Sequence, residues 1–225
     1  MQGLAQSLAQ HPWAWGAIVA LGAWHGLNPG MGWLFAVSSG LQARRAEGVF
    51  RALPPLALGH FVAMLAALLP FTLFMLYFER VGAIRAAAGG LLVIFGVYKL
   101  LSRRHPRFLA RIGPSHLVVW SFFIATAHGA GLMLVPVVLG LCSTNAPEAQ
   151  RGHQALLELA SGSLGMTLAA VSVHTMAMLV TGGTIAWVVY RYVGLRLLRS
   201  AWVNVDLLWA ALLVVAGAIA LAVTL

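Results

Sequence analysis

Four histidines stand inside long apolar stretches of this chain, at His25, His60, His128 and His174. Neutral imidazole is a ligand for Zn, Cu, Ni and Fe. An ionisable side chain at membrane depth is expensive to place there and usually has a functional role. A single histidine in such a setting is more often a hydrogen-bonding group between helices. Four at similar depth, on four different stretches, predict a shared polar site.

Methionines accompany these histidines at helical spacing. Met64 lies one helical turn after His60, and Met178 lies one turn after His174, so each pair shares a helix face. Met31 follows the histidine of the first stretch. Thioether sulfur selects soft ions such as Cu(I), whereas a lone methionine commonly fills a gap in a core. The repeated pairing predicts a soft transition-metal site in which these three methionines assist the histidines.

Carboxylates are scarce in the chain, which has only five Asp and Glu residues. None of them can be placed well inside an apolar stretch; Glu79, Glu158 and Asp206 stand near the ends of such stretches. Because Mg, Ca and Mn prefer oxygen ligands, the sequence disfavours these hard ions. A monovalent soft cation suits the remaining His and Met ligands better.

The segment AWHGLNPGMGWLF (23–35) puts helix-breaking residues beside the first histidine. Pro29 has no N–H, so we expect the carbonyl of His25 to lose its partner four residues on. Asn28 and Gly30 add an amide and a flexible backbone to the same place, which predicts a broken helix with a polar cavity. A proline kink that serves packing alone is the alternative. A second segment of this kind contains Gly129, Gly131 and Pro136.

The elements that carry these residues are apolar enough to cross a membrane. The chain of 225 residues is 61% hydrophobic and 8% charged, whereas soluble domains have about a quarter of their residues charged. Apolar runs of about 20 residues or more cover a bilayer core of about 30 Å. We therefore predict an all-α integral membrane protein that forms one transmembrane domain over 1–225, with spans at 14–39, 52–78, 82–102, 115–142, 161–190 and 203–225.

The basic residues are distributed unevenly, which predicts the orientation. Of the 14 Lys and Arg residues, all but Arg80, Arg85 and Arg151 fall in or beside the segments 40–51, 103–114 and 191–202. Positive charge collects in cytoplasmic loops, so these three loops are predicted to be cytoplasmic and both termini non-cytoplasmic, most simply in a bacterial inner membrane. The net charge of +9 is then explained by topology rather than by nucleic-acid binding.

Three short similarities in the same order indicate an internal duplication. The pattern H-x-x-A-M-L begins at His60 and again at His174, L-L-V-[IV]-x-G occurs within 89–96 and 210–217, and His-Gly occurs at His25 and His128. The halves are about 13–103 and 114–225. Because their first spans cross in opposite directions, the spans form two inverted repeats of three helices, with the first and fourth spans broken by Gly and Pro. This arrangement is typical of secondary transporters with a midplane site.

Two of these motifs resemble those of the nickel/cobalt transporters. The stretch HGLNPGM from His25 is similar to their H-x-x-D-x-D-H motif, and LALGHFVAML with His60 is similar to their L-G-H-S-x-x-V motif. The three-plus-three arrangement resembles the wider lysine-exporter superfamily, including its urease-accessory-like membrane proteins. The resemblance implies passage of a small cation or solute through a midplane site. Asn28, Gly30 and Met31 replace Asp, Asp and His, which shifts the expected substrate towards a softer or less charged one.

The sequence thus favours a transporter of a soft transition-metal cation of the Cu, Ni, Co or Zn class, working by alternating access. The expected partners are the lipid bilayer and the transported ion or solute, with a homo-oligomer permitted by small residues such as Ala86 and Gly90. No organic cofactor and no nucleic acid are expected. A transporter of a small organic solute and a haem-binding redox subunit are the alternatives. No nucleophile–base set or phosphate loop is visible, so an enzyme is not expected.

Overall fold

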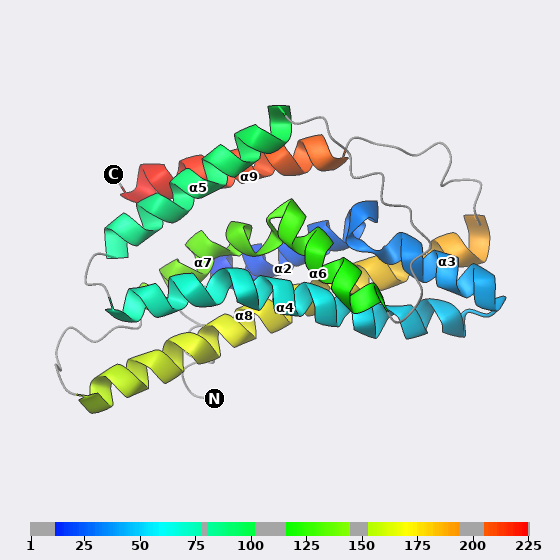
Figure 1. Cartoon of the computed structure of the whole chain (residues 1–225), viewed down its shortest axis with the longest axis horizontal. Helices are drawn as coiled ribbons and strands as arrows, with labels where there is room; N and C mark the ends of the chain where they lie inside the picture. Colours follow the sequence, from blue (N-terminus) through cyan, green and yellow to red (C-terminus); the bar gives the residue numbers. More distant parts are fainter. Residues whose placement is uncertain (1–11, 78–80, 102–115, 145–152, 194–204, 225) are drawn as a thin grey trace.

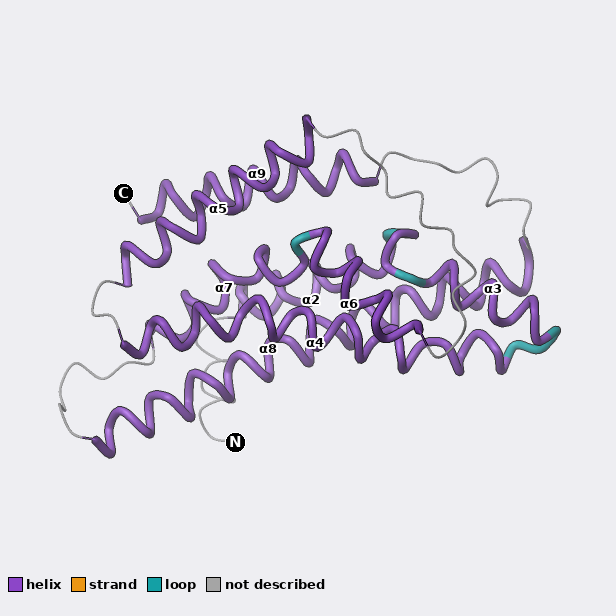
Figure 2. The backbone as a smooth tube through the Cα atoms, viewed as in Figure 1, coloured by secondary structure: helices purple, strands orange, loops and turns teal. Residues whose placement is uncertain are grey.

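The computed structural model describes residues 12–77, 81–101, 116–144, 153–193 and 205–224. Within these ranges the chain is helical throughout and contains no strand, so the all-α prediction is confirmed (Figure 2). The elements are α2 (Pro12–Leu27), η1 (Pro29–Met31), α3 (Trp33–Ala43), α4 (Glu47–Tyr77), α5 (Val81–Leu101), α6 (Leu117–His128), α7 (Ala130–Thr144), α8 (His153–Val188), η3 (Val189–Val193) and α9 (Val205–Thr224). The predicted cytoplasmic loop 103–114, most of 191–202 and the first 11 residues lie outside the described ranges.

The first apolar stretch is interrupted where the sequence predicts. Asn28 leaves the helix with φ −69° and ψ 118°, its side-chain oxygen accepts from the Gly30 N–H at 2.9 Å, and Gly32 is left-handed at φ 111°. The Asn28 N–H donates to the His25 carbonyl at 3.1 Å. Pro29 has no N–H for this carbonyl, so the predicted loss of the partner four residues on does occur. Asn28 supplies the missing donor one residue earlier, as a tighter turn allows.

The fourth apolar stretch is interrupted at a single residue. Gly129 takes a left-handed conformation (φ 70°, ψ 30°) between α6 and α7, and its N–H caps the last carbonyls of α6. The break lies in the predicted segment Gly129–Pro136, at its first residue, and α7 then continues through Gly131 and Pro136 to Thr144. α4 likewise runs through Pro54, Pro55 and Pro70. Neighbouring helices can support a proline inside an apolar helix, so proline alone does not mark a break here.

We expect Gly129→Ala to destabilise the protein by at least about 1–2 kcal/mol, the cost of a left-handed conformation for a residue with a Cβ. The added methyl group would also lie 2.6 Å from the ring of Phe95. The measurement is thermal unfolding of the purified protein in detergent. Gly90→Ala is the matched control, because a Cβ there meets nothing within 4 Å. Equal unfolding temperatures for the two variants would contradict the prediction.

The helices pack in a pattern that joins distant parts of the chain. α2 packs against α8, α4 packs against both α6 and α8, and α5 pairs with α9. Figure 1 shows the α5–α9 pair along one edge of the molecule, beside α7, with α4 and α8 crossing the body of the fold. The core between them is apolar and includes Ile18, Met64, Leu68 and Leu134, all with at most 1% of their surface exposed.

The outside of the described helices is also apolar. Trp13, Ile94 and Phe123 expose 64–70% of their surface. Two stretches, Glu47–Leu73 and Leu164–Val193, are long and apolar enough to cross a membrane by length and composition. Shorter apolar helices occur at Ala86–Leu101, Leu117–His128 and Ala210–Ala222.

Candidate functional site

Three of the four histidines meet in the interior of the fold. His25 comes from α2, His60 from α4 and His174 from α8. Their ring centroids are 5.3 Å apart for His25 and His60, 4.9 Å for His25 and His174, and 5.6 Å for His60 and His174. Each ring is at most 1% exposed. We call these three residues the histidine cluster.

The close approach of α2 to α8 brings the cluster together. A methyl group added at Gly22 would collide with the His174 carbonyl, and one added at Gly26 would lie 2.8 Å from the Cβ of Thr181. Small residues allow helix backbones to approach closely in this way. Because Gly22 and Gly26 flank the position of His25 on α2, the same contact that joins the helices also sets the imidazole of His25 against that of His174.

His25 in the last turn of α2 and His128 at the end of α6 make the same contact with the backbone. The Nδ1 atom of His25 lies 3.2 Å from the Leu21 carbonyl, and that of His128 lies 2.9 Å from the Ile124 carbonyl. A carbonyl can only accept, so Nδ1 carries a proton in both rings. Metal-binding histidines usually make the same contact, in which the nitrogen that does not bind the metal donates to a backbone carbonyl.

His128 lies at the edge of the cluster, beside the first helix break. It is 7% exposed, and a Cβ at Gly30 would lie 3.6 Å from its Nε2 atom. The structure therefore brings all four predicted histidines into one region, three of them in direct ring contact.

Several buried polar atoms in this region make no hydrogen bond within the described residues. They are Nε2 of His60, both ring nitrogens of His174, Nδ2 of Asn28 and Oγ1 of Thr175. His174 lies beside the Ile18 carbonyl, but neither nitrogen reaches hydrogen-bonding geometry. A buried polar group without a partner costs about 1–3 kcal/mol. These atoms are concentrated around the histidine cluster and the first break.

The rings are not arranged for metal binding as they stand. Within the described residues, no three His, Cys, Asp or Glu side chains form a group that could hold a metal ion. His60 and His174 are parallel, with an interplanar angle of 6°, and His25 meets them edge-on. A bound ion needs nitrogens about 2.0–2.1 Å from one point. Coordination by the cluster therefore requires the imidazoles to rotate from these positions.

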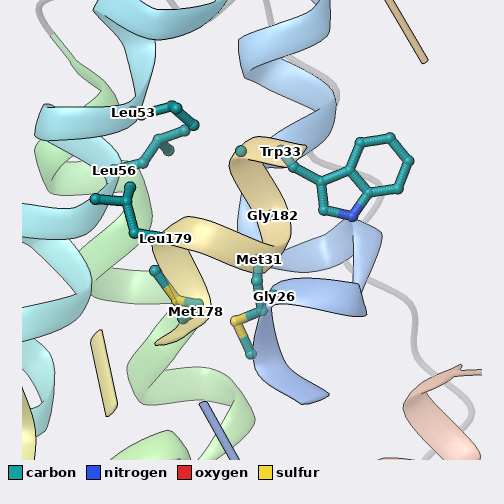
Figure 3. Close-up of a pocket in the computed structure, with 9 residues that line it drawn as sticks. Gly26, Met31, Trp33, Leu53, Leu56, Met178, Leu179 and Gly182 are labelled. Carbon is teal, nitrogen blue, oxygen red and sulfur yellow. The ribbon is translucent and has the colours of Figure 1, made fainter. Parts of the chain in front are cut away.

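The predicted methionines divide between two environments. Met31 and Met178 line a cavity of about 20 Å³ between the first broken helix and α8 (Figure 3). Met64 is fully buried in the apolar core, and Met133 packs in a separate apolar cluster with Leu92 and Leu213. The structure therefore brings together two of the three methionines predicted for the site and places Met64 in the core.

The residues predicted to line the pathway also divide. Asn28 is 2% exposed and, with Gly30, lies in the break beside His128. Gly131 instead packs on α4, where an added Cβ would be 3.3 Å from the Met64 carbonyl. Pro29 begins the η1 turn, and Pro136 lies within α7. Asn28 and Gly30 of the predicted pathway thus lie beside His128, whereas Gly131 lies against α4.

Sequence reasoning missed polar contacts that hold the surrounding helices. The hydroxyls of Thr72 on α4 and Thr167 on α8 are buried and lie 3.1 Å apart. The Trp33 indole donates to the Leu27 carbonyl at 3.2 Å, which bridges the first break. The signal for the threonines was the presence of hydroxyl groups in otherwise apolar spans, but their spacing did not show that they would meet.

Comparisons with family models, curated proteins and solved structures found no match to the chain.

Proposed function

We propose that this protein is a membrane transporter of a soft transition-metal cation, of the Cu, Ni, Co or Zn class. The observation that carries the proposal is the histidine cluster, with three fully buried imidazoles from three helices and ring centroids 4.9–5.6 Å apart. Within the described residues, Nε2 of His60 and both nitrogens of His174 make no hydrogen bond. The ion binds when these rings rotate to face it. Alternating access moves the ion across, because rearranged helices expose the cluster first to one side and then to the other.

The proposal places six spans in the bilayer. α4, α5, α8 and α9 each supply one span, while α2 with α3 and α6 with α7 supply the two broken ones. The halves of a broken span are too short to cross a core of about 30 Å separately. Exposed apolar side chains on α2, α5 and α6 support lipid contact. The protein lies in the inner membrane of a bacterium with both termini outside, as the arginine distribution predicts.

The packing of the helices supports two related halves. If the halves are related, α2 corresponds to α6 and α4 corresponds to α8, so the contact between α2 and α8 should be matched by one between α6 and α4. Both contacts occur. In the same way, Gly89 corresponds to Ala210 and Gly96 corresponds to Gly217. A methyl group added at Gly217 would lie 2.7 Å from the Gly89 carbonyl, and one added at Gly96 would lie 3.0 Å from the Ala210 carbonyl. The shared carbonyl contact of His25 and His128 fits the same exchange.

The size and charge of the region favour an ion over the alternatives. The cavity beside the cluster is about 20 Å³, whereas sites for small organic ligands are about 300–1,000 Å³. A haem would require still more space. Glu47, the acidic side chain that the structure describes, is exposed at the start of α4 and lies 3.4 Å from Arg51. With imidazole and thioether ligands and no described carboxylate nearby, the region suits a soft cation.

The test is metal binding and transport by the wild-type protein. We expect purified protein to retain a stoichiometric soft metal ion in elemental analysis, and vesicles containing it to accumulate or release that ion. A bound ion should be released once acidification protonates the imidazoles, because only neutral imidazole can act as a ligand. Absence of binding and transport for Cu, Ni, Co and Zn alike would contradict the proposal.

A further inference from the structure

The cavity next to the histidine cluster lies on one side of it along the helices. Its lining residues follow His25 in the first broken helix, follow His174 on α8 and precede His60 on α4. That direction leads to the segment 44–51, which contains Arg44, Arg45 and Arg51. The cavity therefore lies between the cluster and the arginine-rich side of the molecule.

Two thioethers give this cavity its chemical character. Met31 and Met178 are 6% and 5% exposed, and Trp33, Leu53 and Leu56 complete much of the wall. Figure 3 shows both methionine side chains reaching the cavity from opposite elements, the first break and α8. The volume of about 20 Å³ is enough for a particle the size of one water molecule, which needs about 10–15 Å³. A bare monovalent ion fits.

The position of Met178 connects this cavity to the cluster. Met178 is one helical turn beyond His174, so the two side chains share a face of α8. Met31 stands at the end of the turn that Asn28 begins. An ion that leaves the imidazoles towards the arginine-rich side therefore meets the two sulfur atoms next.

We propose that Met31 and Met178 form a thioether site for Cu(I), which makes a monovalent soft cation the substrate class of this protein. The inference rests on the proposed transport function. Thioethers select Cu(I) over Ni, Co and Zn, and a buried apolar cavity accepts one positive charge at a lower desolvation cost than two.

Exchanging the two repeats turns Met31 and Met178 into Met133 and Met64, and these two methionines do not form an equivalent pair. Met64 lies in the apolar core with Ala63 and Leu68, while Met133 packs with Leu92 and Leu213. Among the residues that the structure describes, the thioether pair is therefore formed on the arginine-rich side alone. It holds an ion that has left the cluster, before release on that side.

The experiment is anaerobic titration of the full-length protein in detergent with Cu(I), in competition with a chromophoric Cu(I) chelator, and a parallel titration with Zn(II). The double variant Met31→Leu/Met178→Leu keeps the volume of both side chains nearly constant. We expect its Cu(I) affinity to fall at least about tenfold and its Zn(II) binding to stay unchanged. X-ray absorption should detect copper–sulfur scattering in the wild type and not in the double variant. Met176→Leu is the matched control, because Met176 is 59% exposed on the same helix.

The outcomes separate this inference from the proposed function. Equal Cu(I) affinity in the wild type and the double variant overturns the thioether site. Binding of Zn(II), Ni(II) or Co(II) without Cu(I) also overturns it, but leaves the metal-transport proposal standing. If the wild type binds none of the four ions, both fail. If both sulfurs are ligands, each single methionine variant shows a partial loss of Cu(I) affinity in the same titration. These two single variants replace the double variant if it does not fold.

Discussion

His174→Gln is expected to lower metal transport into vesicles by at least about 10–100-fold, the loss typical of damage to a metal site. The ring of His174 lies against both other rings of the cluster. Its centroid is 4.9 Å from that of His25 and 5.6 Å from that of His60. Glutamine keeps a polar side chain but removes the imidazole ligand. Both nitrogens of His174 lack a hydrogen bond within the described residues, so the fold loses no such contact and thermal stability should change little.

The control for this experiment is His116→Gln, because His116 is exposed at the start of α6. Transport and metal content should be unchanged in that variant. A His174→Gln protein that folds and transports at the wild-type rate would show that the cluster is not the transport site. A variant that loses stability and transport together would instead assign His174 a structural role.

Gly22→Ala is expected to separate α2 from α8 and to destabilise the protein by about 1–3 kcal/mol, the usual cost of overpacking. The new methyl group would collide with the His174 carbonyl and lie 2.9 Å from the Cβ of Ala177. Neither neighbour can move easily, because one is helix backbone and the other is attached directly to it. The shift should also move His25 away from His174 and reduce metal binding.

Gly16→Ala on the same helix is the matched control. A Cβ at Gly16 meets nothing within 4 Å, and alanine is a better helix former than glycine by about 1 kcal/mol. The control should therefore be as stable as the wild type or more so, by thermal unfolding in detergent. If Gly22→Ala behaves like Gly16→Ala, the close packing of α2 on α8 does not hold the site together.

Which polar residues lie together could be predicted from the sequence, because polar side chains are rare in its long apolar stretches. Histidines at similar positions in related stretches indicated one shared region, and Pro29 with its glycines indicated the first break. Ring orientation was not predictable. His60 and His174 lie parallel because of how α4 packs on α8, a contact between residues that are remote in the sequence.

Local rules failed where neighbouring groups intervened. Pro136 is a typical helix breaker, yet α7 passes through it. The carbonyl of His25, for which Pro29 has no donor, accepts from the N–H of Asn28 instead. The separation of the methionines was equally hidden. Helical spacing places Met64 and Met178 alike relative to their histidines, but one meets the apolar core and the other a cavity. Such differences depend on the opposing helix, which spacing along one helix does not describe.

The pairing of α2 with α8 also determines when the site can form during synthesis. Gly22 and His25 are made early, whereas His174 is made after most of the chain. At about 5–20 residues per second, the ribosome needs roughly 8–30 seconds to pass from one to the other. The three rings of the cluster can therefore meet only after most of the chain has been made.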